Sequence, residues 1–82
     1  FAALFWLGNA QYATNNYKDA LASFRALVAM GGDHQRVPEA ILAIANCQLE
    51  LKDTKGARKT LDDLIATYPS TEAAQAAKDR LA

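Results

Sequence analysis

Several residue types are scarce in this chain of 82 residues, and each scarcity excludes a class of protein. A single cysteine cannot form a disulfide within the chain, so disulfide bonds do not define the fold. Four glycines and two prolines are too few for a loop-rich fold. The formal net charge is zero, whereas a surface for nucleic acid or an anionic membrane needs a basic excess. No apolar run approaches the ~20 residues of a membrane span, so we expect no membrane-embedded segment.

Alanine is abundant instead, at 18 of the 82 residues, and it is the best helix former. Apolar residues recur at steps of three and four, which is the spacing of helices and not of strands. Turn-forming residues interrupt this pattern after about residues 14, 30, 51 and 67. The pattern therefore predicts five helices, at about 2–14, 17–30, 37–51, 54–67 and 71–82.

The chain also repeats itself when it is shifted by 37 residues. Identical residues then coincide, among them Asn9 with Asn46, Gln11 with Gln48, Ala20 with Ala57 and Leu27 with Leu64. A helical pair that recurs in tandem predicts stacked hairpins. We expect an all-α fold in one domain over residues 1–82. Repeat one spans about 1–34, repeat two about 37–70, and a closing helix about 71–82.

The residues at these positions resemble the tetratricopeptide repeat. The resemblance is carried by Leu7-Gly8-Asn9-Ala10, Tyr12, Tyr17, Ala20 and Phe24, and in the second copy by Ala57 and Pro69. It implies tandem tetratricopeptide hairpins in a right-handed superhelical stack. It also implies small residues where the two helices of a hairpin touch, which here are Gly8 and Ala20, then Ala45 and Ala57.

A narrower resemblance covers the whole chain. It is carried by Phe5-Trp6-Leu7-Gly8, Val37-Pro38-Glu39-Ala40, Tyr68-Pro69-Ser70 and the closing Lys78-Asp79-Arg80-Leu81. Together these segments resemble the C-terminal domains of the YbgF proteins of the Tol–Pal system, also called cell division coordinators CpoB. The resemblance implies a periplasmic protein that binds TolA, has a link to a class A penicillin-binding protein, and coordinates outer-membrane constriction with peptidoglycan synthesis.

Residues for catalysis or metal binding do not form a set in the sequence. His34, the only histidine, lies in the glycine-containing loop without convergent ligands, so we predict a solvated loop residue. Cys47 lies within a helix with no basic neighbour at helical spacing, which favours a buried thiol over a reactive one. We therefore expect no catalytic residues, no metal, no cofactor and no enzymatic activity.

The expected function is binding of a protein partner in a groove. Stacked hairpins line a concave face with the first helix of each repeat. The resemblance places eight residues there: Phe5, Asn9, Tyr12 and Ala13, then Leu42, Asn46, Leu49 and Glu50. Six of them are the candidates for contact with a partner: Phe5, Asn9, Tyr12, Leu42, Asn46 and Leu49. Apolar anchors with amides between them suit an amphipathic helix or an extended peptide. The alternative is that several of these side chains only pack between the helices.

A second surface follows from the direction of Trp6, which points about 100° around the helix from Phe5. Where no helix precedes them, Trp6 and Phe1 form an apolar patch that favours homo-oligomers. The chain begins at Phe1 without an initiator methionine, so we expect an excised domain whose targeting information is absent.

Two other functions stay open. A co-chaperone repeat that holds an acidic C-terminus needs basic residues beside the groove asparagines, where this chain has Phe5 and Leu42. A repeat scaffold of another envelope assembly complex, such as an outer-membrane assembly lipoprotein, differs in the sequence upstream of the repeats.

Overall fold

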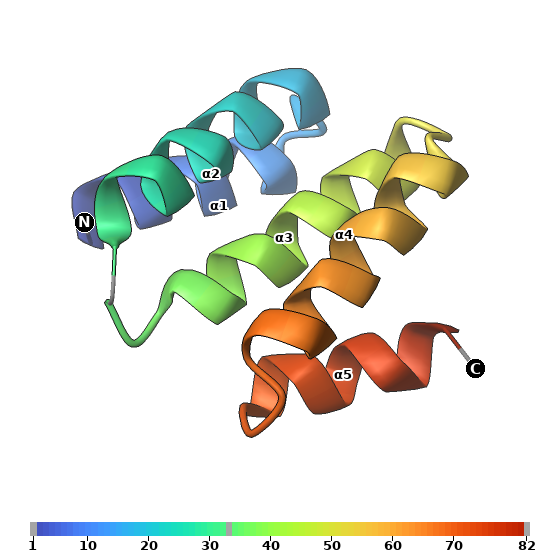
Figure 1. The fold of residues 1–82 in the computed structure, drawn as a ribbon. Coiled ribbons are helices and arrows are strands. Elements are labelled where there is room, and N and C mark those ends of the chain that lie inside the picture. The colour runs from blue at the N-terminus through green and yellow to red at the C-terminus, as the bar shows by residue number, and fades with distance from the viewer. Residues whose placement is uncertain (1, 33, 82) are drawn as a thin grey trace.

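The computed structural model describes residues 2–32 and 34–81, and these residues form five helices joined by short turns (Figure 1). The helices are α1 (Ala2–Ala13), α2 (Tyr17–Gly31), α3 (Val37–Glu50), α4 (Thr54–Thr67) and α5 (Glu72–Leu81). Each helix begins and ends within one residue of the bounds predicted from the sequence. The prediction of an all-α fold built from two hairpins and a closing helix is confirmed.

The helix ends have local causes. Pro38 lies in the first turn of α3, where its missing N–H is not needed. The Asp53 carboxylate accepts a hydrogen bond from the Gly56 amide at 3.1 Å and caps α4. The Thr71 hydroxyl oxygen accepts from the Ala74 amide at 3.1 Å at the start of α5. Gly32 follows α2 with a φ of 53°, a left-handed conformation that glycine adopts without steric cost.

The two hairpins turn in the same way. Asn15 and Lys52 occupy equivalent repeat positions, and both have a left-handed backbone, with φ of 67° and 65°. The next amide reaches back five residues in each hairpin: Asn16 N–H to Gln11 C=O, and Asp53 N–H to Gln48 C=O, both at 2.8 Å. This pairing satisfies the last carbonyls of α1 and α3. The shift of 37 residues thus describes the backbone as well as the sequence.

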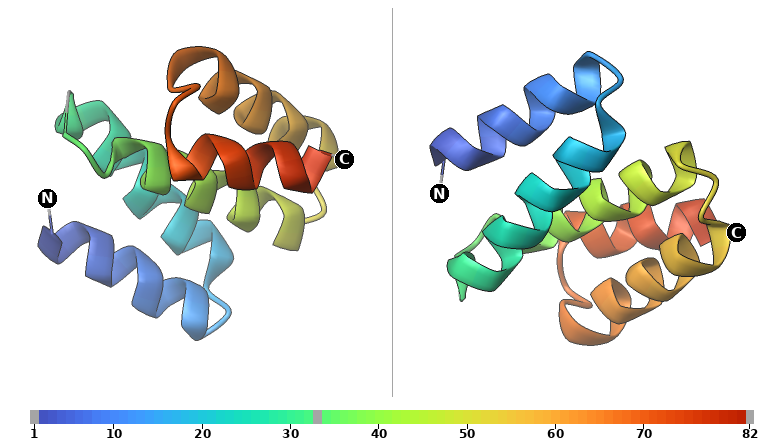
Figure 2. Two further views of the ribbon diagram at one scale, coloured as in Figure 1. Left: turned by 90° about the horizontal axis from the view of Figure 1, so that it is seen from below. Right: turned by 90° about the horizontal axis from the view of Figure 1, so that it is seen from above.

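Packing proceeds from each helix to the next, and α3 lies in the middle of the stack (Figures 1 and 2). α2 packs against α1 and α3, while α4 packs against α3 and α5. α3 contributes Ala40, Ile44 and Cys47 to a first buried cluster with residues of α2, and Ala45 to a second cluster with α4 and α5. α3 therefore contributes buried residues to both clusters, one on each side of the helix.

Within each hairpin, the helices meet through a small residue and a hydrogen bond. A Cβ atom at Gly8 would lie 2.8 Å from the ring of Phe24, so Gly8 lets α1 approach that ring. The sequence predicts Gly8 and Ala20 at the contact between these helices, and Phe24, one turn after Ala20 on α2, supplies the atoms nearest to Gly8. The Ser23 hydroxyl donates to the Gln11 side-chain oxygen at 2.6 Å, and the Thr60 hydroxyl donates to that of Gln48 at 2.7 Å. These two bonds lie at equivalent repeat positions.

Candidate protein-binding surface

Within residues 2–32 and 34–81, no group of three or more His, Cys, Asp or Glu side chains could hold a metal ion. His34 is exposed, and its Nδ1 accepts a hydrogen bond from the Arg36 amide at 3.1 Å just before α3. Cys47 is fully buried, and burial raises the pKa of its thiol to about 11. It is therefore a neutral core residue at physiological pH, as the sequence predicted.

Among the described residues, each helix is too short or too polar to cross a bilayer.

The α1 part of the predicted groove begins at Phe5. Its half-buried ring meets the buried ring of Phe24 edge to face, with centroids 6.0 Å apart and an interplanar angle of 86°. The Arg36 guanidinium lies over the ring of Phe5, 5.8 Å from its centroid. Phe5 thus supports the core with one part of its ring and presents a cation–aromatic pair at the N-terminal ends of α1 and α3.

Tyr12 lies at the opposite end of α1. Its half-buried ring contacts that of Tyr17 in α2, with centroids 5.2 Å apart and an interplanar angle of 72°. Burial raises the pKa of both phenols, and the negative charge of Glu50 at the end of α3 raises them further. The C-terminal ends of α1 and α3 therefore lie close enough for Glu50 to act on both rings.

The α3 part of the groove is less uniform. Leu42 is partly buried against the second core cluster, so its side chain supports packing as well as any surface. Asn46 is half-buried, as is Asn9 in α1, and Leu49 is 39% exposed. The six predicted groove residues thus keep some exposure, but Phe5, Tyr12 and Leu42 also pack on the core. Their role in binding stays a prediction.

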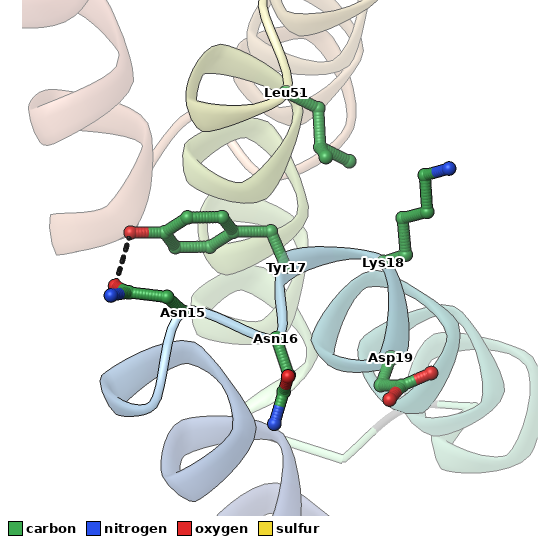
Figure 3. A pocket seen from close by; sticks show the side chains of 6 residues that line it. All are labelled: Asn15, Asn16, Tyr17, Lys18, Asp19 and Leu51. Atoms are coloured by element: carbon green, nitrogen blue, oxygen red, sulfur yellow. Dashed lines mark hydrogen bonds between the residues drawn. The ribbon is translucent and has the colours of Figure 1, made fainter.

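A hollow of about 410 Å³ lies beside the turn between α1 and α2 (Figure 3). Its lining comes from that turn, the first residues of α2 and the residue after α3: Asn15, Asn16, Tyr17, Lys18, Asp19 and Leu51. The Tyr17 hydroxyl donates to the Asn15 side-chain oxygen at 2.8 Å, which fixes the ring across this region (Figure 3). Sequence reasoning did not select this hollow, because it forms only when the α1–α2 turn meets the end of α3.

Comparison with known protein families matches the tetratricopeptide repeat twice, over residues 2–30 and 39–71. The two matches begin 37 residues apart, as the internal repeat requires, and together they cover most of the chain. The chain belongs to the tetratricopeptide-repeat family. A comparison with curated proteins found no match. Tetratricopeptide repeats are scaffolds for protein–protein interaction, so this tetratricopeptide-repeat domain is a protein-interaction module.

Two residues of this tetratricopeptide-repeat domain extend the predicted groove, Arg36 and Tyr17. Arg36 contacts Phe5 at one end, and Tyr17 contacts Tyr12 at the other, where Glu50 contributes a negative charge. Arg36 and Tyr17 lie outside the first helices of the repeats, and the prediction took groove residues only from those helices. A signal did exist for Tyr17, because it follows Tyr12 by five residues across an Asn-Asn turn.

The outer side of α1 carries the other predicted surface. Trp6 is 66% exposed and Leu7 49% exposed, so apolar side chains face outward here. Phe1, the second member of the predicted patch, lies outside the described residues. The opposite end of the stack differs: α5 buries Ala73, Ala74 and Ala77 and exposes polar residues. The polar outer side of α5 is typical of a capping helix in a repeat stack.

Proposed function

We propose that this chain is a non-enzymatic binding module of the periplasmic Tol–Pal system. It binds a TolA-like protein and takes part in coordinating outer-membrane constriction with peptidoglycan synthesis during division. A class A penicillin-binding protein is the second partner, and homo-oligomers form through the outer side of α1. Family membership supports protein binding in general. The proposal for this system and compartment rests on the resemblance to the YbgF (CpoB) domains.

One observation carries the choice of surface. Phe5 and Tyr12 on α1 are half-buried aromatic side chains, and half-buried amides follow on α1 and α3. Partly buried aromatic side chains lose little conformational freedom when a partner covers them, which is why such residues dominate interface energies. Amides between them orient a partner through hydrogen bonds. The groove residues of α1 and α3 therefore suit an amphipathic helix of the partner.

Calorimetric titration with the long helical domain of a TolA-type protein tests this proposal. Tyr12→Ala is expected to weaken binding about 10-fold or more, as loss of an aromatic anchor does. Asn46→Ala is expected to weaken it less. Trp6→Ala is the matched control, because it removes an exposed aromatic side chain from the same helix outside the groove.

The outcomes separate the possible surfaces. Binding that Trp6→Ala abolishes and Tyr12→Ala leaves intact would move the partner to the outer side of α1. Saturable binding of an acidic C-terminal peptide, without binding of the TolA-type domain, would favour the co-chaperone function instead. Sedimentation at high concentration tests the homo-oligomer, and a monomer in both the wild type and Trp6→Ala would contradict it.

A further inference from the structure

The outer side of α1 is apolar throughout. α1 contains no charged residue, and each of its exposed residues has an apolar or aromatic side chain: Ala2, Ala3, Trp6, Leu7, Ala10 and Ala13. The exposed residues of each of the other four helices include charged side chains. A helix that is apolar on all sides is typically covered on all sides, whereas α2 packs on the side of α1 that carries Gly8.

The second hairpin shows that this side of a first helix can be a packing surface. Three of the exposed positions of α1 recur in α3, 37 residues later, as buried residues that belong to a cluster with α2: Ala40, Ile44 and Cys47. The most exposed of them is Ile44, at 8%. The outer side of α1 therefore has the composition of a contact between helices, without the covering helix that α3 has.

The other end of the stack argues against a head-to-tail arrangement of copies. α5 lies at that end (Figures 1 and 2), and its exposed residues are all polar or charged: Glu72, Gln75, Lys78, Asp79 and Arg80. Packing the outer side of α1 against α5 would remove these charges from water without giving them partners. A contact between two identical surfaces avoids this cost, and it is the most common arrangement of identical subunits.

The order of large and small residues on α1 suits such a contact. Positions 6 and 10 lie symmetrically about residue 8, as do positions 3 and 13. When two α1 helices pack antiparallel about a two-fold axis at that level, Trp6 of each copy meets Ala10 of the other, and Ala3 meets Ala13. Each large ring then lies on small side chains, which let the two helices approach closely. In a parallel pair the two tryptophans would meet each other, and the alanines would leave gaps.

We propose that two copies of this chain form a closed dimer through the outer side of α1, with the two helices antiparallel about a two-fold axis. The proposal rests on the proposed function in that the outer side of α1 is the contact between copies. Phe5, Asn9 and Tyr12 are half-buried on another side of α1, so the dimer leaves the groove of each copy accessible. The dimer is therefore bivalent, and two grooves strengthen binding to a partner that offers two sites.

The area of the outer side sets the strength of this dimer. Trp6 alone exposes on the order of 150 Å², since an aromatic side chain has up to about 250 Å² to bury and 66% of Trp6 is exposed. With Leu7 and the four alanines, the outer side has the size of the larger apolar patches on monomers, roughly 300–600 Å². Two such surfaces together bury roughly 1,000 Å², the lower bound of a specific interface. We therefore expect a weak dimer, with a dissociation constant on the order of 100 µM.

Sedimentation equilibrium of the 82-residue chain tests the dimer. The mass is expected to rise from 8.9 kDa at low concentration toward twice that value, and to level off there. Ala10→Glu is expected to weaken the dimer at least about 10-fold, because the two-fold axis places each new charge against an apolar side chain of the other copy. Ala22→Glu is the matched control, because it makes the same change at an exposed alanine of α2. Trp6→Ala is expected to lose most of the association.

Cysteine cross-linking tests the direction of the two helices. Chains with Ala3→Cys are mixed with chains with Ala13→Cys and treated with a short bifunctional thiol reagent. Cross-links between the two kinds of chain are expected to dominate, because position 3 of one copy meets position 13 of the other. Cys47 is fully buried and neutral, so it does not compete for the reagent. A parallel pair would instead join chains of the same kind.

The outcomes separate this inference from the proposed function. A mass that rises past the dimer, cross-links confined to chains of the same kind, or equal effects of Ala10→Glu and Ala22→Glu would overturn only this inference. A monomer at every concentration would overturn it together with the proposed homo-oligomer, and would leave binding of the TolA-type domain to its own titration. A dimer with cross-links between positions 3 and 13 that fails to bind that domain contradicts only the proposed partner.

Discussion

Leu7 in the first hairpin and Ile44 in the second occupy the same repeat position, yet Leu7 is 49% exposed and Ile44 is 8% exposed. α2 covers the side of α3 that carries Ile44, whereas within the described residues the corresponding side of α1 faces outward. The same contrast separates Ala10, which is exposed, from the fully buried Cys47. A repeat position therefore specifies the direction in which a side chain points from its helix. Whether that side chain is buried depends on whether a neighbouring hairpin packs on that side.

A second difference lies inside the hairpins. Gly8 faces Phe24 in the first hairpin, and the equivalent residues of the second are Ala45 and Leu61. The large phenylalanine ring is paired with glycine, and the smaller leucine side chain is paired with alanine. Both aromatic and aliphatic partners are at least 98% buried, so neither hairpin has space to spare. The summed side-chain volume of the pair is thus similar in the two hairpins, although both residues differ.

The largest expected effect comes from truncating the two equivalent residues on α1 and α3. Ile44→Ala should lower the free energy of unfolding by about 2–4 kcal/mol, because it leaves a cavity in the first core cluster. Leu7→Ala should lower it by about 0.5–1 kcal/mol, because half of that side chain is already in water. Urea denaturation followed by circular dichroism measures both. Equal losses would show that the outer side of α1 is covered in solution.

The buried thiol of Cys47 makes the stability of the chain depend on pH, whereas Ala10 at the equivalent position cannot. Burial raises the pKa of its thiol from 9.0 to about 11, so between these values the folded chain holds a proton that the unfolded chain releases. Stability must then fall as pH rises through this range, by at most about 1.4 kcal/mol per pH unit. Cys47→Ala, which copies Ala10 of the first hairpin, should remove this loss. The charge of Cys47 is among the causes that raise the pKa of Tyr12 and Tyr17, so the difference between the two denaturation curves reports the thiol together with its effect on these phenols. Parallel curves would contradict the prediction.

Substitution of Gly8 tests whether the summed volume of the Gly8–Phe24 pair matters for stability. Gly8→Ala should destabilise the chain by about 1–2 kcal/mol through contact with Phe24, although alanine has the better helix propensity. The double variant Gly8→Ala/Phe24→Leu, which copies Ala45 and Leu61, should recover most of the loss. A double-mutant cycle in thermal unfolding gives the coupling between the two sites. Additive effects would mean that the ring of Phe24 moves aside freely.

The smallest expected effect concerns the hairpin turns. Lys52 has the left-handed backbone that Asn15 has in the first hairpin, and asparagine tolerates that conformation better than lysine. Lys52→Asn should therefore stabilise the chain by about 0.5 kcal/mol. Asn15→Lys should destabilise it by a similar amount. Thermal unfolding of both variants checks the signs, and a loss for Lys52→Asn would indicate a contact of the lysine that outweighs the backbone.

The sequence predicts the helices well, because their periodicity, Pro38 and the residues around Asp53 and Thr71 act locally. Contacts between helices were harder to predict. The hydrogen bonds of Ser23 and Thr60 join one helix of a hairpin to the other, so the residues next to them in the sequence do not predict them. The two residues do coincide in the repeat alignment.

The candidate binding surface stays a prediction, and contacts between helices also determine which of its side chains are exposed. Family geometry selected residues by their position on the first helices, so it included Leu42, which partly packs on the core, and omitted Tyr17 and Arg36. Which side of a ring is available depends on its tertiary neighbours, as Phe24 and Arg36 determine for Phe5. That information becomes available only when the hairpins are stacked.

The pairing of Gly8 with Phe24 has a consequence for recombination. A crossover in the turn between α1 and α2 would join a helix of one repeat to a helix of the other, and would place alanine against phenylalanine or glycine against leucine. A crossover between α2 and α3 moves whole hairpins and keeps each pair intact. Chimeras and duplications of this chain should therefore tolerate breakpoints near residues 32–36 and reject those at residues 14–16.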